Sequence, residues 1–444
     1  MRFLLLLLIP LSSFGQQIIQ RDPEIDRYVH QLSADSMKHT VEKLVSFGSR
    51  HTLSSNSTPQ KGIAAARRWV LSQFQNYSKS SNGRLTAQLQ TWNLKPDGRR
   101  IDKEYEIANV VATLKGSDPG DDRVFVISAH IDSRAKDIMN RDIDSPGAND
   151  DGSGVATVLE LARVLSKSNF PATLVFLVVS GEEQGLYGAE YFAQQAVDQK
   201  SNIEAVLNND TMGSSAGSET GLIDNTRLRV FSEGLPGYQT AEQATRIRAV
   251  GGESDGKARQ VARYFKEVGE RYVDQLEVVL IFRNDRFQRG GDHTPFVNRG
   301  FAAVRITEMN ENFDHQHQDI HTEKNVQYGD LIQFMDFEYL RKNACVNLAT
   351  LVNLAKAPQM PQNVQLDLRG PASQTKLAWE APKTGKVKGY YVLLRETYQP
   401  FWQKKIYVSD TTIILPYSRD SYFFAIQAVN DTGNESLPAL PGSK

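Results

Sequence analysis

The chain has 444 residues, of which 40% are hydrophobic and 23% charged, with 31 Gly and 17 Pro. This length fits one large α/β domain with a smaller module, and the composition excludes collagen-like, disulfide-rich and wholly disordered proteins. Lys and Arg number 51 against 52 Asp and Glu, so a net charge of −1 offers no overall field to attract nucleic acid or an anionic membrane. The single cysteine, Cys345, lies in an apolar helical pattern, which predicts a buried, non-catalytic thiol.

The N-terminal segment combines a positive Arg2, an apolar run over 3–11 and small residues up to Gly15. This pattern is typical of a secretory signal peptide, and the apolar run is too short to span a bilayer. We therefore predict a signal peptide over 1–15 and a protein that is secreted or periplasmic, without a membrane anchor.

The next segments predict a layered α/β unit over 16–355. Residues 34–47 and 59–77 carry apolar side chains at helical spacing. Apolar runs of strand length follow at 108–114, 124–129, 173–179, 205–207, 278–282 and 301–306. Several of these runs are continuous and separated by helical stretches, which predicts a mixed, largely parallel sheet sandwiched by helices.

Two further segments complete this unit. Residues 214–277 are polar apart from a helical stretch at 257–273, which predicts an excursion beside the sheet. A long apolar periodic segment at 328–354 predicts a closing helix.

After a linker at 356–360, the pattern changes to short alternating segments separated by turn residues, which predicts an all-β, immunoglobulin-like sandwich over 361–444. This segment resembles a fibronectin type III domain in the following residues: Pro361, Val364, Leu377, Trp379, Pro382, Tyr390, Val392, Tyr422, Ile426, Ala428, Val429 and Gly433. A domain of this kind would suit contact with a protein or a polysaccharide.

Side chains that can bind metal follow successive predicted strands. His130 follows the run 124–129, Glu183 follows 173–179, and Asp210 follows 205–207. The carboxyl ends of parallel strands line the ligand crevice of open α/β sheets, so we expect these groups to converge. The loop 146–154 adds Asp150 and Asp151 just before a helix.

Each of these residues also has an ordinary structural explanation. An Asp at a helix start is commonly an N-cap, adjacent glutamates are commonly solvated, and a His after a strand is often only hydrogen-bonded. Their conjunction at consecutive strand ends favours a site for two metal ions that share a carboxylate, a solution for attacking an amide with water. His and carboxylate ligands suit zinc, and cobalt or manganese could substitute for it.

At these residues the sequence resembles the secreted co-catalytic di-zinc aminopeptidases, whose relatives include glutamate carboxypeptidase and the catalytically silent transferrin receptor. The resemblance covers roughly 41–355 and rests on these motifs: Asn109-Val110-Val111-Ala112, His130-Ile131-Asp132, Pro146 to Gly154, Ser180-Gly181-Glu182-Glu183-Gln184-Gly185, Asn209-Asp210, Gly291-Asp292-His293-Thr294-Pro295-Phe296 and His321-Thr322.

The resemblance implies two zinc ions, with His130 and Asp210 on one, Glu183 and His321 on the other, and Asp150 between them. It also implies that Glu182 is the general base, and that Asp132 hydrogen-bonds the imidazole of His130. In this family the peptide bond between Asp150 and Asp151 is commonly cis.

The last ligand has three candidates, His315, His317 and His321, and composition does not choose between them. The family pattern and the threonine after it favour His321. The sequence departs from the pattern at Ile320, where tyrosine is frequent, and at Asn325, where aspartate is usual. The sequence therefore does not assign the residue that would stabilise the oxyanion of the reaction intermediate.

The resemblance implies a peptidase, and we expect an aminopeptidase. Asp292 and His293 resemble a segment near the family's substrate pocket, and Arg289 could meet a substrate carboxylate or be solvated. The alternatives are a carboxypeptidase, a glutaminyl-cyclase-like acyltransferase with one zinc, and a catalytically silent binding protein.

Overall fold

The computed structural model describes residues 21–54, 58–218, 220–235, 237 and 239–442. The predicted signal peptide, residues 1–15, lies outside the described residues and stays a prediction. The chain divides into two compact units, Arg21–Ala357 and the residues from Pro358 onward, and each is described by itself. Among the helices that the structure describes, none combines the length and apolarity needed to cross a membrane.

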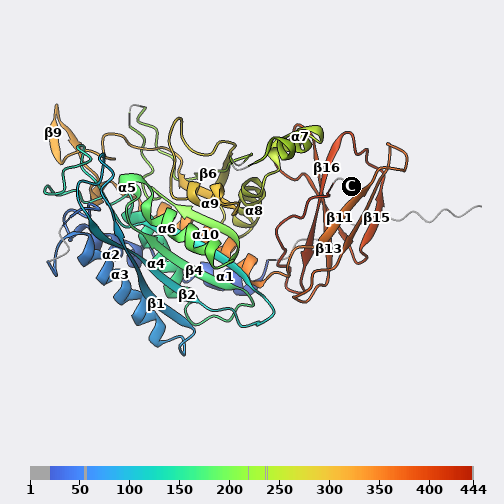
Figure 1. Ribbon diagram of the computed structural model, residues 1–444, viewed down its shortest axis with the longest axis horizontal. Coiled ribbons are helices and arrows are strands. Elements are labelled where there is room, and N and C mark those ends of the chain that lie inside the picture. The colour runs from blue at the N-terminus through green and yellow to red at the C-terminus, as the bar shows by residue number, and fades with distance from the viewer. Residues whose placement is uncertain (1–20, 55–57, 219, 236, 238, 443–444) are drawn as a thin grey trace, which may run out of the picture. The chain divides into compact units, whose positions relative to one another are not determined.

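The first unit is built around an eight-stranded sheet in the order β1-β2-β4-β3-β5-β8-β6-β7. Figure 1 shows the first unit with helices packed along this sheet. Its strands are β1 (Leu85–Leu94), β2 (Tyr105–Leu114), β3 (Arg123–His130), β4 (Thr173–Val179), β5 (Asn202–Asn209), β6 (Arg227–Phe231), β7 (Glu277–Ile281) and β8 (Ala303–Glu308). The central strands β4, β3, β5 and β8 are mutually parallel, and antiparallel pairs flank them. The predicted mixed, largely parallel sheet is thus confirmed.

Helices cover both faces of this sheet. They are α1 (Pro23–Val29), α2 (Ala34–Val45), α3 (Gly62–Lys79), α4 (Gly152–Leu165), α5 (Glu182–Gly185), α6 (Tyr187–Asp198), α7 (Ala241–Ala249), α8 (Lys257–Tyr272), α9 (Thr294–Asn298) and α10 (Phe337–Lys356). The β3-α4-β4 and β4-α6-β5 crossovers run in opposite directions across the sheet, so right-handed connections place α4 and α6 on opposite faces. Helices α6 and α9 contribute to one apolar layer, and α4 and α10 contact β3.

Local sequence signals explain the helix that begins at the site. Asp151 is the N-cap of α4, and its carboxylate accepts the backbone N–H of Gly154 at 3.0 Å. A Cβ at Gly154 would lie 2.5 Å from that carboxylate and 2.6 Å from the carbonyl oxygen of Asn209. The glycine therefore lets the start of α4 approach the end of β5.

Two predicted elements differ from the structure, and one strand of the sheet was not predicted. The polar segment 214–277 is not only an excursion, because its residues 227–231 form β6 and pair with both β8 and β7. The closing helix begins at Phe337 rather than at 328, because Tyr328 belongs to a short hairpin of β9 (His321–Glu323) and β10 (Val326–Tyr328). The prediction also lacked β1, in which only the two end residues, Leu85 and Leu94, are buried.

Cys345 lies in α10 and is buried, as predicted. Burial raises the pKa of its thiol to about 12, so the thiolate needed for nucleophilic chemistry is scarce at neutral pH.

The second unit consists of two three-stranded antiparallel sheets, β11-β12-β15 and β14-β13-β16. Their strands are β11 (Gln362–Asp367), β12 (Thr375–Glu380), β13 (Gly389–Glu396), β14 (Lys404–Val408), β15 (Thr412–Leu415) and β16 (Tyr422–Val429). One core joins both sheets, with Trp379 from β12 packed edge-on against Tyr390 from β13. The predicted β-sandwich is confirmed, whereas the specific likeness to fibronectin type III stays a prediction.

Candidate metal centre

Four of the candidate ligands come from three adjacent parallel strands and the loop before α4. His130 ends β3, Glu183 follows β4, Asp210 follows β5, and Asp150 lies in the loop before α4. Because β4, β3 and β5 are parallel neighbours, their carboxyl ends lie at one edge of the sheet. The chain leaves β3 toward β4 and leaves β5 toward the opposite side of the sheet, so a topological switch point lies between β3 and β5. All four side chains are buried.

These residues form two clusters that share Asp150. One cluster holds His130, Asp150 and Asp210, and the other holds Asp150, Glu183 and His317, with the ligand-type atoms of each within 4.8 Å of one another. His130 Nε2 lies 3.2 Å from Oδ1 of Asp150, whereas His317 Nε2 lies 2.9 Å from its Oδ2. One oxygen of Asp150 therefore faces each cluster, as a bridging ligand requires.

The structure brings His317, and not His321, to this centre, which corrects the ligand expected from the motif. His317 Nε2 lies 2.9 Å from Oε1 of Glu183. The exposed His321 lies in the β9–β10 hairpin, where its ring stacks on Tyr328 at 4.6 Å. The course of the backbone determines which histidine reaches the centre. His321 pairs with Tyr328 in the hairpin, and its side chain is exposed to solvent.

Asp132 has a different partner from the one expected. Its backbone carbonyl, not its carboxylate, accepts from Nδ1 of His130 at 3.0 Å. Because a carbonyl only accepts, Nδ1 carries the proton and Nε2 keeps its lone pair for a metal. The Asp132 carboxylate instead accepts the backbone N–H groups of Gly181, Glu182 and Glu183. Asp132 thus positions the turn that presents both glutamates.

The two adjacent aspartates of the loop take separate tasks. Asp151 is fully buried, and its carboxylate accepts from the backbone N–H groups of His130, Gly154 and Thr211. It therefore joins the ends of β3 and β5 to α4, whereas Asp150 faces the two clusters. The peptide bond between them is cis, as in the resembling family.

Two residues that sequence reasoning did not select hold this loop. Asp330 accepts the backbone N–H of Asp150 at 2.7 Å and that of Asn149 at 2.9 Å. Arg50, which is fully buried, donates to the carbonyl oxygens of Pro146 and Gly147. They come from distant parts of the chain, so spacing in the sequence gave no signal for them.

Glu182 lies beside the clusters without belonging to either of them. Burial, together with the charges of Glu183 and Asp292, raises the pKa of Glu182 well above its ordinary value. A raised pKa favours a carboxyl group that accepts a proton and returns it, as a general base does.

The substrate candidates differ in exposure. Asp292 is buried, and its two carboxylate oxygens have no hydrogen-bond partner among the described residues. Burial and nearby carboxylates raise its pKa to about 8. His293 is also buried, with Nε2 at 2.8 Å from the carbonyl oxygen of Asn284, whereas Arg289 is exposed.

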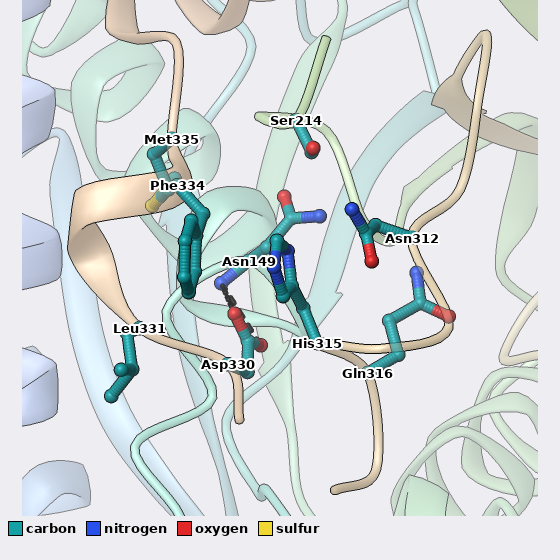
Figure 2. A pocket seen from close by; sticks show the side chains of 9 residues that line it. All are labelled: Asn149, Ser214, Asn312, His315, Gln316, Asp330, Leu331, Phe334 and Met335. Atoms are coloured by element: carbon teal, nitrogen blue, oxygen red, sulfur yellow. Dashed lines mark hydrogen bonds between the residues drawn. The ribbon is translucent and has the colours of Figure 1, made fainter. Parts of the chain in front are cut away.

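A small recess lies next to the loop residues Asn149 and Gln316, which adjoin Asp150 and His317 in the sequence (Figure 2). Figure 2 shows the ring of His315 facing that of Phe334, and their centroids lie 3.7 Å apart. Stacking on Phe334 keeps His315 in this recess, outside the two clusters.

The donor set of the centre fits zinc. It combines imidazole nitrogens with carboxylate oxygens, and each cluster offers three ligand-type residues, which leaves room for water or substrate in a tetrahedral site. Burying the carboxylates Asp150, Glu183 and Asp210 together is costly unless cations compensate their charge. Metal ions would provide that compensation.

The parallel sheet and the paired His–carboxylate clusters define the class of protein as a metallohydrolase of α/β architecture. Residues 109–337, more than half of the chain, match the model of peptidase family M28, and the chain belongs to this family. The family resemblance inferred from the motifs is thereby confirmed.

Similar sequences extend over nearly the whole chain. It is 42% identical over 421 residues to a probable zinc metalloprotease of Leptosphaeria maculans, covering 95% of this chain and 97% of the relative. A probable zinc metalloprotease of Pyrenophora tritici-repentis is 42% identical over 439 residues, covering 97% of this chain and 90% of the relative.

Solved structures support the fold. The LapA aminopeptidase of Legionella pneumophila has a TM-score of 0.54 at 18% identity, covering 76% of each chain. A leucine aminopeptidase precursor of Bacteroides thetaiotaomicron has a TM-score of 0.50 at 19% identity, covering 73% of this chain and 98% of that chain. At these identities the similarity concerns the fold alone.

Proposed function

We propose that the protein is a zinc-dependent exopeptidase that uses two zinc ions and removes N-terminal residues from peptides. The observation that carries this proposal is the pair of buried clusters sharing Asp150, with one carboxylate oxygen toward each. The zinc metalloprotease relatives support the choice of metal.

His130, Asp210 and one oxygen of Asp150 would hold one ion, and Glu183, His317 and the other oxygen of Asp150 would hold the second. Bound zinc would polarise the scissile carbonyl and acidify a water molecule. Glu182 then takes the proton of the attacking water and delivers it to the leaving amine. Asp132 fixes the backbone of Glu182 and Glu183, so that Glu183 lies in a candidate metal cluster while Glu182 stays outside it.

Charge favours attack from the N-terminus. The centre offers carboxylates to a substrate ammonium group, whereas a carboxypeptidase needs a cationic anchor for the terminal carboxylate. Of the arginines near Asp292, Arg286 is already paired with Glu311 and Asp285, and Arg289 is exposed. Two solved structures with this fold, LapA and the leucine aminopeptidase precursor, are of proteins named aminopeptidases, in agreement with this direction.

The two-metal mechanism is tested by zinc content and turnover of the wild-type protein and of Glu182→Gln. We expect about two zinc ions in both proteins and a loss of roughly 10²-fold to 10⁴-fold in turnover for Glu182→Gln, the usual contribution of a general base. One zinc ion at full wild-type activity would contradict the two-metal mechanism. Near-native turnover of Glu182→Gln would contradict the role of Glu182.

The direction of attack is tested by mass spectrometry of a peptide digested in its free and N-acetylated forms. We expect stepwise loss of N-terminal residues from the free peptide, and resistance of the acetylated copy because it lacks the ammonium group. Efficient loss of C-terminal residues from the acetylated copy would show a carboxypeptidase instead.

A further inference from the structure

A fully buried arginine contacts one of the candidate metal ligands. Arg305 lies in β8 opposite Asn208 of β5, the strand that leads to Asp210, and its side chain is 0% exposed. Its Nε donates to Oδ2 of Asp210 at 2.9 Å. The other oxygen, Oδ1, lies 3.9 Å from Nε2 of His130, in the metal cluster. The two oxygens of Asp210 thus have different partners.

The opposite end of the guanidinium is also fixed. Nη1 of Arg305 donates to Oδ1 of Asp285 at 3.0 Å, and the Asp285 side chain is 0% exposed. Arg286 continues the chain of ion pairs from Asp285 to Glu311, which pairs with Arg229 at 3.0 Å. Because both ends of Arg305 are held in a buried network of alternating charge, its Nε has little freedom to leave Asp210.

Packing alone does not require an arginine at this position. The neighbouring residues Ala303, Val304 and Ile306 of β8 are apolar and buried. A buried guanidinium loses its hydration, which is unfavourable unless ion pairs with partners such as Asp210 and Asp285 compensate it. Arg305 binds Oδ2 of Asp210, whereas Oδ1 lies toward His130. A group that orients a metal ligand is expected at the oxygen that does not face the metal.

We propose that Arg305 is a positioning residue that restrains Asp210 to bind its metal ion through Oδ1 alone. This inference rests on the proposed two-metal function. Without Arg305, Asp210 could rotate about its side-chain bonds, and the ion held by His130 and Asp210 would lose a fixed ligand. The ion held by Glu183 and His317 would keep its own ligands.

The test is a zinc titration of chelator-treated protein in competition with a fluorescent chelator, which resolves the affinities of the two ions. We expect Arg305→Met to weaken one zinc ion by roughly 10-fold to 100-fold, the usual cost of removing a partner that orients a ligand, and to leave the other unchanged. Arg305→Lys retains a cation and should weaken the same ion less. Arg229→Met is the matched control, because Arg229 lies at the outer end of the network, and both affinities should stay at wild-type values.

Thermal unfolding of the metal-free proteins separates this role from a purely structural one. A structural arginine would lower the unfolding temperature and leave the ratio of the two zinc affinities unchanged, and that result would overturn the proposal. An equal loss of affinity for both zinc ions would also overturn the proposal. Tighter zinc binding would overturn it too, because it would mean that repulsion between the Arg305 guanidinium and the metal ion outweighs the orientation of Asp210. If Arg305→Met does not fold, Arg305→Lys decides in the same way. A wild-type protein that binds only one zinc would contradict the two-metal function itself, whereas unchanged affinities in a two-zinc protein would contradict only the role of Arg305.

Discussion

Asp150 connects the two halves of the centre, because its two carboxylate oxygens face two different histidines. Its neighbour Asp151 has the same side chain but binds backbone N–H groups around the start of α4. At the scale of single residues, function thus follows from which partners a side chain meets. The same distinction separates Glu183, which faces His317, from Glu182, which lies outside both clusters.

The assignment of the last ligand gives a prediction at this scale. His317→Ala should lower the zinc content by about one ion per chain and strongly reduce turnover, because it removes one of three ligand-type residues of its cluster. His321→Ala should leave both unchanged, because His321 is exposed and stacked on Tyr328. Zinc analysis and turnover of a peptide substrate check both variants. Loss of zinc in His321→Ala with full zinc in His317→Ala would reverse the assignment.

At the scale of elements, the centre depends on the loop before α4, which contains no helix or strand of its own. Two residues bind the backbone of this loop. Asp330 follows the β9–β10 hairpin, and Arg50 precedes α3. Strand ends therefore supply three of the ligands, and this loop supplies the bridge.

We predict that Asp330→Ala destabilises this loop. The substitution leaves the buried backbone N–H groups of Asn149 and Asp150 without their acceptor, and each unsatisfied donor costs about 1–3 kcal/mol. The free energy of unfolding should fall by about 2 kcal/mol or more, and zinc should bind more weakly because Asp150 is less well placed. Denaturant unfolding and zinc titration measure the two effects.

Asp319→Ala is the matched control for this prediction, because Asp319 is an aspartate of the same region and accepts the exposed backbone N–H of Lys136. It should change the free energy of unfolding by only a few tenths of a kcal/mol, as surface substitutions commonly do. Equal effects of the two substitutions would mean that Asp330 does not hold the loop.

At the scale of the whole molecule, the metal centre lies within Arg21–Ala357, and the β-sandwich follows from Pro358. All candidate ligands, Glu182 and Arg305 belong to the first unit. Compact units with their own cores commonly fold independently.

We therefore predict that a chain ending at Ala357 keeps its zinc content and most of its turnover of small peptides. Zinc analysis and kcat/KM on an aminoacyl anilide compare it with the full chain. A soluble, folded truncated protein that has lost its zinc would show that the sandwich supports the centre.

The sequence by itself determined the fold class and most of the centre. Continuous apolar runs ending in His130, Glu183 and Asp210 predicted parallel strands with converging ligands, because parallel strands place their carboxyl ends at one edge. The same patterns predicted β4 with the bounds that the structure has. Local periodicity and strand-end position are properties of neighbouring residues, so a sequence can display them.

Only the tertiary structure decided which histidine joins Asp150 and Glu183, since three histidines within seven residues offer the same chemistry and only the chain path separates them. It also decided that Asp132 serves His130 through its carbonyl, because its carboxylate is occupied by three backbone N–H groups. Strand β6 pairs with β8 and β7, and Arg305 meets Asp210, across long separations in the sequence. Such contacts depend on how distant segments pack, and no local pattern in the chain encodes them.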